Sequence, residues 1–143
     1  MQFPTSLAIL TALILPVASV SVTYDTVYDN RDGSLDTVAC SNGPNGLKTR
    51  GFNKFGDLPN FPFIGGAAEV AGWNSPRCGS CYALTFTDGQ GVKKSINILA
   101  VDHAANGLNI GLQAMNTLTN GHGVEYGVVD VSYKPVSPHV CGL

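Results

Sequence analysis

The sequence has few charged residues and no cluster of one sign. Of its 143 residues, 13% are Asp, Glu, Lys or Arg, and the net charge is −2; about 25% charged residues is usual for a soluble protein. The eight Lys and Arg residues are scattered, so no basic stripe is available to follow a phosphate backbone. The composition therefore argues against nucleic acid as a partner, and the length is that of one domain.

No apolar run is long enough to cross a bilayer, which takes about 20 residues. The longest one, Leu7 to Leu15, is followed by Val17-Ala18-Ser19, which places small residues at the −3 and −1 positions of a cleavage site. We therefore predict a signal peptide over residues 1–19, cleaved after Ser19, and a secreted domain over residues 20–143. Only the Met1 amino group is positive before Asp25, so a membrane anchor is the alternative; after cleavage no membrane segment remains.

Long uninterrupted helices are scarce, because 17 Gly and 8 Pro residues break the chain into short segments. The alternation of apolar and polar residues predicts five strands and one helix. The strands are expected over residues 21–28, 34–39, 81–87, 95–101 and 125–133, the helix over residues 109–119, and a long loop region over residues 41–77. This pattern indicates a mainly β fold with short helices, either a small barrel or a sandwich.

The chain has only four cysteines, and all of them lie in the predicted mature part: Cys40, Cys78, Cys81 and Cys141. An even number in a secreted domain predicts two disulfides and no free thiol. Three pairings are possible. Chain entropy argues only against a bond between Cys78 and Cys81, whose ring would constrain little of the unfolded chain, so two pairings stay open.

Motifs for redox, metal and serine-hydrolase chemistry are weak or missing. Cys78-Gly-Ser-Cys81 has C-x-x-C spacing, but a predicted strand follows it, and no helix dipole would stabilise a thiolate. His103, His122 and His139 supply no recognisable second ligand pair for zinc, so no metal site or cofactor is predicted. The Gly-x-Ser-x-Gly motif of a serine nucleophile does not occur in the sequence.

Most of the acidic residues lie in predicted turns, and Asp102 is the exception. It ends the apolar run Ile96 to Val101, which places it at the rim of a barrel. Glycoside hydrolysis needs a second carboxylate within about 9.5 Å, and Asp25 is one candidate. Binding of sugars needs amides and carboxylates for the hydroxyls and aromatic rings for the apolar sugar faces; the available residues are Tyr24, Tyr28, Trp73, Asn42, Asn45 and Asn109.

Several motifs together resemble the cerato-platanin family of fungal proteins over the whole predicted mature chain. They are Val20-Ser-Val-Thr-Tyr-Asp25, Val38-Ala-Cys-Ser-Asn-Gly43 with Gly46-Leu47, Ala71-Gly-Trp73, Cys78-Gly-Ser-Cys81, Val101-Asp102 and Val140-Cys-Gly-Leu143. The resemblance implies a six-stranded double-ψ β-barrel, related in shape to expansins. It also implies disulfides that join Cys40 to Cys78 and Cys81 to Cys141.

The same resemblance implies a function without catalysis. Members of the family are secreted or wall-associated, bind oligomers of N-acetylglucosamine in a shallow groove and provoke plant defence, so chitin and plant immune receptors are the expected partners. Some members loosen cellulose without hydrolysis, and some self-associate at interfaces. Carried over onto this sequence, the expected carbohydrate-binding residues are Asp102, Tyr24, Asn42 and Gly43. The alternatives are a surface-active wall protein and a weak hydrolase that uses Asp102 and Asp25.

Overall fold

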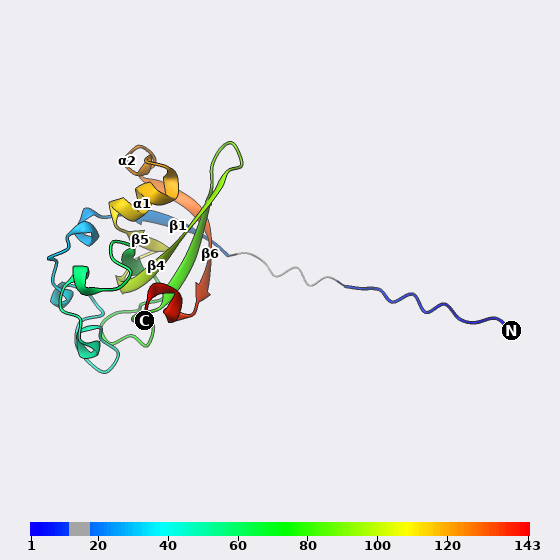
Figure 1. Ribbon diagram of the computed structural model, residues 1–143, viewed down its shortest axis with the longest axis horizontal. Coiled ribbons are helices and arrows are strands. Elements are labelled where there is room, and N and C mark those ends of the chain that lie inside the picture. Colours follow the sequence, from blue (N-terminus) through cyan, green and yellow to red (C-terminus); the bar gives the residue numbers. More distant parts are fainter. Residues whose placement is uncertain (12–17) are drawn as a thin grey trace.

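The computed structural model describes residues 1–11 and 18–143 (Figure 1). Residues 1–11 have no regular secondary structure and are exposed. Part of the predicted signal peptide, including Val17 and the end of its apolar run, lies outside the described residues, and cleavage after Ser19 stays a prediction. Within the described ranges, no helix has the length and apolar character that a membrane span requires.

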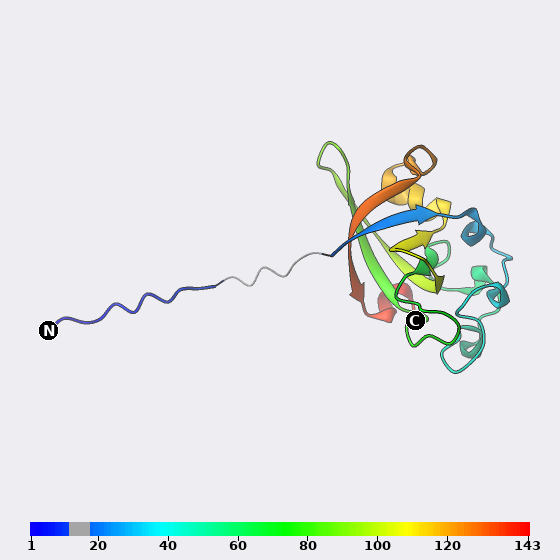
Figure 2. The ribbon, with the colours of Figure 1, turned by 180° about the vertical axis from the view of Figure 1, so that it is seen from behind.

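Six strands form a closed barrel. They are β1 (Ala18–Tyr24), β2 (Ile64–Ala67), β3 (Cys81–Thr87), β4 (Lys93–His103), β5 (Leu108–Ile110) and β6 (Val128–Val136), joined in the order β1-β5-β2-β4-β3-β6. The β1–β5 and β2–β4 pairs are parallel and the other four are antiparallel. Figure 2 shows β1 beside β6, the pair that closes the barrel. The barrel that the family resemblance implied is confirmed.

Two short helices, α1 (Leu112–Thr119) and α2 (Gly123–Tyr126), lie together at one end of the barrel (Figure 1). A helix was predicted over residues 109–119. The observed helix α1 begins three residues later than predicted, because Asn109 belongs to β5. The first turn of α1 is capped from a distant segment: the Asp29 carboxylate accepts hydrogen bonds from the backbone N–H groups of Leu112 and Gln113, at 2.8 and 3.0 Å. An acidic group there also complements the helix dipole.

The loop region covers one wall of the barrel and extends the core beyond it. Residues 98–101 of β4 are fully buried on both faces of the strand. One face lines the barrel interior, and the other is covered by the loops, which add a second apolar layer. Its largest members are Tyr28, Leu35, Leu47, Phe55 and Leu58.

Both disulfides have the pairing implied by the family resemblance. Cys40 is bonded to Cys78, and Cys81 is bonded to Cys141, so all four cysteines are used. The first bond closes the long loop region, because Cys40 directly precedes residues 41–77 and Cys78 directly follows them. The second fastens the start of β3 to the 3-10 turn Pro138–Cys141 near the C-terminus.

Two of the predicted strands are wrong in part or entirely. The strand predicted over residues 21–28 ends at Tyr24, because the Asp25 carboxylate accepts a hydrogen bond from the Val27 N–H and caps a 3-10 turn over Thr26–Asp29. The strand predicted over residues 34–39 is a 3-10 turn over Leu35–Thr37, capped by Ser34. In both turns a short polar side chain competes with the sheet for the backbone N–H groups.

The sequence analysis missed β2 and misplaced β6. Residues 64–67 read Ile-Gly-Gly-Ala, which lacks the β-branched residues typical of strands. Its glycines are needed for close approach, since a Cβ atom on Gly66 would lie 2.7 Å from the carbonyl oxygen of His103. β6 begins three residues later than predicted, because residues 123–126 form α2.

Candidate functional site

The strand register places four residues in one row across the outer face of the barrel. In β2, Gly66 pairs with Asp102 of β4 on one side and with Asn109 of β5 on the other, and Asn109 pairs with Thr23 of β1. Paired residues point to the same face of a sheet. The neighbours of Thr23 and Asn109 along their strands are buried or packed against the core, so these two side chains face outward. We call Thr23, Gly66, Asp102 and Asn109 the polar row.

The glycine in the polar row leaves a gap between two polar side chains. With strands about 4.8 Å apart, Asp102 and Asn109 stand roughly 10 Å from each other across Gly66. Asn109 is held in place, because its Oδ1 atom accepts a hydrogen bond from the Thr23 hydroxyl at 3.0 Å. A carboxylate and an amide at this spacing can bind hydroxyl and N–H groups of an extended polar ligand.

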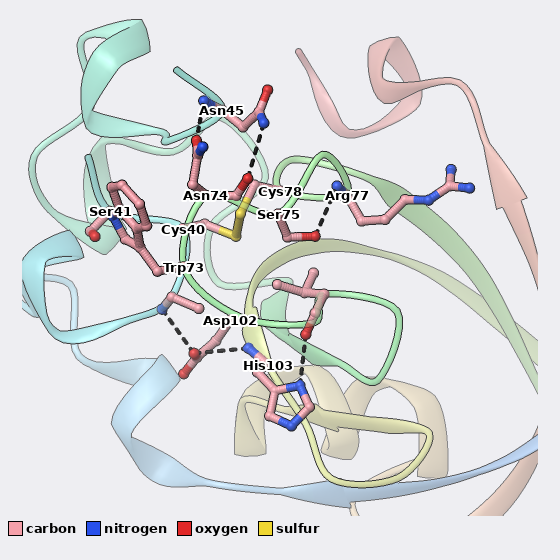
Figure 3. Close-up of a disulfide and its surroundings, with 12 residues drawn as sticks. Cys40, Ser41, Asn45, Trp73, Asn74, Ser75, Arg77, Cys78, Asp102 and His103 are labelled. Carbon is pink, nitrogen blue, oxygen red and sulfur yellow. Dashed lines mark hydrogen bonds between the residues drawn. A yellow bond between two sulfur atoms is a disulfide. The ribbon is translucent and has the colours of Figure 1, made fainter. Parts of the chain in front are cut away.

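The Asp102 carboxylate is already bonded within the protein (Figure 3). Its Oδ1 atom accepts hydrogen bonds from the backbone N–H groups of Ala39, at 3.0 Å, and His103, at 2.8 Å. Its Oδ2 atom accepts a hydrogen bond from the Tyr28 hydroxyl at 3.0 Å. Asp102 therefore fastens two loop segments to β4 before it contacts any ligand, and these three bonds leave only part of its acceptor capacity for a sugar.

The pKa of the Tyr28 hydroxyl is raised by its burial and by this contact with Asp102. Burial raises the pKa of Tyr28 well above its ordinary value of about 10, and the negative charge of Asp102 and its hydrogen bond raise it further. The charge of Asp25 adds a smaller effect in the same direction on this pKa. The hydroxyl stays protonated at neutral pH and keeps donating to Asp102.

Alkaline pH is expected to destabilise the fold through Tyr28. Because its pKa is higher in the folded state, only the unfolded chain releases this proton just above pH 10, so stability is full below that pH and falls as the pH rises. The free energy of unfolding should fall by about 1 kcal/mol more in the wild type than in Tyr28→Phe between pH 10 and 11, because the tyrosine of the unfolded chain is half ionised at pH 10 and almost fully ionised at pH 11. Urea unfolding at both pH values measures this difference; equal losses in the two proteins would contradict it.

An exposed tryptophan, Trp73, follows Gly66 of the polar row in the sequence. The side chain of Trp73 is 63% exposed, and its Nε1–H donates a hydrogen bond of 2.7 Å to Asn42 Oδ1. Gly43 has φ +84°, and a Cβ atom there would come within 3.0 Å of the indole ring. Asn45 fixes the next residue, because it donates to both the side-chain and the main-chain oxygen of Asn74. The ring is thus an oriented apolar plane on the surface, which we call the indole platform (Trp73, Asn42 and Gly43).

One short segment connects the polar row to the indole platform. Ala39 is bonded to Asp102, and three residues later Asn42 is bonded to Trp73. The disulfide between Cys40 and Cys78 lies between these contacts and ties the two loop segments together (Figure 3). The structure therefore brings Asp102, Asn42 and Gly43 into one region.

Tyr24 is not brought into this region. Its register partner is Ile110, which is fully buried, and the Tyr24 ring packs against the core. A role for Tyr24 in sugar binding stays a prediction without support from its position. Asn109 and Thr23 are the members of the polar row that the sequence analysis did not assign to it. Asn109 was among the sugar-binding candidates, but it was read as the start of a helix.

The other titratable groups near Asp102 have hydrogen-bond partners of their own within the protein. The ring of His103 is bonded to the backbone oxygen of Val70 at 2.6 Å, and Asp25 caps its own turn. In the part of the chain that the structure describes, no three His, Cys, Asp or Glu side chains group to hold a metal ion.

The model of the cerato-platanin family matches residues 20–143, which include all of the barrel except the first two residues of β1. The chain belongs to the cerato-platanin family. A heat-stable 19 kDa antigen of Coccidioides immitis is 40% identical, with 100% of this chain and 99% of that protein covered. Allergen Asp f 15 of Aspergillus fumigatus is 46% identical over 85% of this chain and 76% of its own length. Cerato-platanin of Ceratocystis fimbriata f. sp. platani is 38% identical over 90% and 91% of the two chains.

Solved structures of the family have the same fold. Cerato-platanin 2 from M. perniciosa superposes with a TM-score of 0.84 and 50% identity, covering 88% of this chain and 100% of that one. The solution structure of the fungal elicitor cerato-platanin gives a TM-score of 0.74 with 39% identity, over 85% and 96% of the chains. The names of these relatives describe antigens, allergens and elicitors, and none of them is the name of an enzyme.

Proposed function

We propose that this cerato-platanin is a secreted protein that binds chitin fragments, oligomers of N-acetylglucosamine, without cleaving them. The observation that carries the proposal is the indole platform beside the polar row. A flat apolar ring can stack on a sugar face, while Asp102 and Asn109 supply polar contacts for hydroxyl and acetamido groups. A ligand that touches both must extend over several sugar units, so binding is expected to strengthen with oligomer length.

The proposal excludes hydrolysis because the carboxylates are engaged as acceptors. Asp102 accepts three hydrogen bonds and Asp25 caps the turn that carries Tyr28. Loosening of wall polymers would then follow from binding alone, without release of sugar ends.

The proposed setting is the fungal wall or the interface between fungus and plant. Both disulfides suit an oxidising, extracellular compartment. A structural neighbour bears the name of a fungal elicitor, and we extend that role to this chain as an effector that plant immune receptors recognise. In this role the protein acts as a ligand as well as a sugar binder.

The function is tested by titrating the oxidised protein with chitin oligomers of two to six units while NMR amide shifts are followed. Saturable shifts should gather around Asp102, Asn109 and Trp73 and strengthen with length. Cellulose oligomers, which lack the acetamido group, serve as the comparison ligand. A reducing-sugar assay on the same samples separates binding from cleavage: released ends would overturn the non-catalytic assignment, and the absence of shifts would overturn the binding assignment.

Trp73→Ala is expected to weaken binding of chitin hexamer about tenfold, which corresponds to roughly 1.4 kcal/mol, because the stacking surface is lost. The fold should be retained, because the ring is mostly exposed. Tyr126→Ala is the matched control, since Tyr126 is also an exposed aromatic residue but lies in α2. Isothermal titration calorimetry measures both; an equal effect of the two changes would remove the indole platform from the site.

A second candidate function is surface activity through self-association. Apolar side chains that are 41–65% exposed gather in sequence at α2 and the start of β6: Val124, Tyr126 and Val128. Exposed apolar patches of this kind favour adsorption at interfaces. Film formation that is abolished by Val124→Ser with Val128→Ser, in a protein that still binds chitin oligomers, would separate this activity from the sugar site.

A further inference from the structure

Glu69 carries a carboxylate that two tyrosines hold and that the proposed sugar site does not use. Glu69, just after β2, accepts a hydrogen bond of 2.7 Å from the Tyr82 hydroxyl at Oε2 and one of 3.4 Å from the Tyr133 hydroxyl at Oε1. The two rings are neighbours across β3 and β6, with centroids 6.1 Å apart. The chitin proposal uses none of these three residues.

These groups face a small hollow at one end of the barrel. The hollow has a volume of about 80 Å³ and is bordered by the first strand residues of β5, the last of β2 and the early part of β1; its apolar walls include Val20, Ala67 and Leu108. Barrel mouths that are mostly apolar and carry a few convergent polar groups are common ligand sites. We call this space, with Glu69, Tyr82 and Tyr133, the mouth hollow.

The charge of the mouth hollow is not balanced by a bonded cation. Within residues 1–11 and 18–143 the ion pairs are Lys48–Asp36, Lys54–Asp32 and His122–Glu125, and none of them involves Glu69. Arg77 is the cation that acts on Tyr82, where it lowers the pKa slightly, but it makes no ion pair with the carboxylate.

The tyrosines act as donors to Glu69 over the whole neutral range. Burial raises the pKa of Tyr82, and its hydrogen bond to Glu69 and the charge of Glu69 add to the effect. The pKa of Tyr133 is raised by burial and by Glu69 as well. The hydroxyls therefore stay protonated, and each carboxylate oxygen keeps lone pairs for a further donor.

We propose that the mouth hollow binds a primary ammonium group. A carboxylate, two tyrosines beside it and apolar walls match a compact cation on an aliphatic carbon. The hollow is small and partly open to solvent, so it has room for one such group. A neutral polar group carries no positive charge to pair with the Glu69 carboxylate, so a cation is the better match.

The ammonium group can come from two sources. One is a free amine or an amino sugar. The other is the chain itself, because Val20 lines the mouth hollow and removal of residues 1–19, as proposed above, would create an α-ammonium group at this residue. The second source rests on that cleavage, and the first does not.

The probe is n-butylammonium chloride, titrated into the secreted protein while NMR amide shifts are followed; mass spectrometry defines the first residue. Saturable shifts are expected at Glu69, Tyr82 and Tyr133. Glu69→Gln should weaken binding about tenfold or more, the factor of one charge-assisted hydrogen bond. Glu125→Gln, the other exposed glutamate, is the matched control and should leave binding unchanged.

A chain with an acetylated α-amino group distinguishes the two sources. If the free amine is the occupant, both chains bind the probe. If the chain's own amino group is the occupant, only the acetylated chain binds it, and in the free chain Glu69→Gln lowers the α-amino pKa. The proposal is overturned if neither chain binds, if n-butanol gives the same shifts, or if Glu69→Gln has no effect. Chitin binding is measured in parallel and does not depend on any of these results.

Discussion

Replacing Cys40 and Cys78 together by alanine is expected to lower the free energy of unfolding by about 4 kcal/mol, because their bond closes a long loop in the unfolded chain. The two cysteines are 38 residues apart in sequence. For a domain of this size, whose total stability is of the order of 5–15 kcal/mol, this is a large share. The variant should also bind chitin oligomers more weakly even where it is folded, since the bond links the segment of Asn42 to that of Trp73. Urea unfolding followed by circular dichroism, and calorimetric titration, measure the two effects.

The other disulfide supplies the control for this experiment. Cys81 and Cys141 are 60 residues apart, so their joint replacement by alanine should cost about as much stability. It leaves the contacts of Trp73 and Asn42 in place, so the folded fraction should retain wild-type affinity for the sugar. Equal losses of affinity in the two variants would show that the first disulfide has no special role in orienting the indole platform.

A strand can be predicted well when the apolar and polar character of its own residues shows which face of the sheet each side chain lies on. β3 was predicted with the correct limits, because its apolar and polar residues alternate over the whole of Cys81–Thr87. β2 was missed for the opposite reason. Its two glycines serve the approach of β4 and β5, and that requirement is visible only when the neighbouring strands are in place.

The turns near the N-terminus show a different limit of sequence reasoning. Thr26, Val27 and Tyr28 have high strand propensity, and they form a 3-10 turn because Asp25 caps it. The same turn is then held by two further contacts, one from Asp29 to the first residues of α1 and one from Tyr28 to Asp102. Local propensity is overruled here by contacts between segments that are far apart in sequence.

The candidate site was predictable in part for a related reason. Asp102 stood out because it ends an apolar run, and Asn42 and Gly43 came from the family resemblance. Their partners could not be found from the sequence, since Tyr28 is 74 residues from Asp102 and Trp73 is 31 residues from Asn42. The polar row depends on the register of four strands, which no local pattern specifies.

Asp102→Ala is expected to lower the free energy of unfolding by about 2–4 kcal/mol, because it leaves the Tyr28 hydroxyl and the Ala39 N–H without their acceptor. The ring of Tyr28 is buried, so water replaces only part of what is lost. This differs from the expectation for a carboxylate that only contacts ligand, whose removal would leave the fold intact. Urea unfolding measures the loss; Asp130→Ala, which removes one exposed hydrogen bond to Ser21, should change stability by less than about 0.5 kcal/mol.

The role of Asp102 as a tie can be separated from a role in sugar binding. Asp102→Asn keeps an oxygen for the two N–H donors, and its amide can donate to the Tyr28 hydroxyl, so it should recover most of the stability. In a Tyr28→Phe background, Asp102→Ala should lower the free energy of unfolding by less than in the wild type, since the Tyr28 hydroxyl that would lose its acceptor is absent. If Asp102→Asn is stable and binds chitin as the wild type does, the charge of Asp102 serves the loops alone. Asn109→Ala then becomes the decisive test of the polar row. The side chain of Asn109 bonds to the exposed Thr23, so its loss should weaken binding while the barrel stays folded.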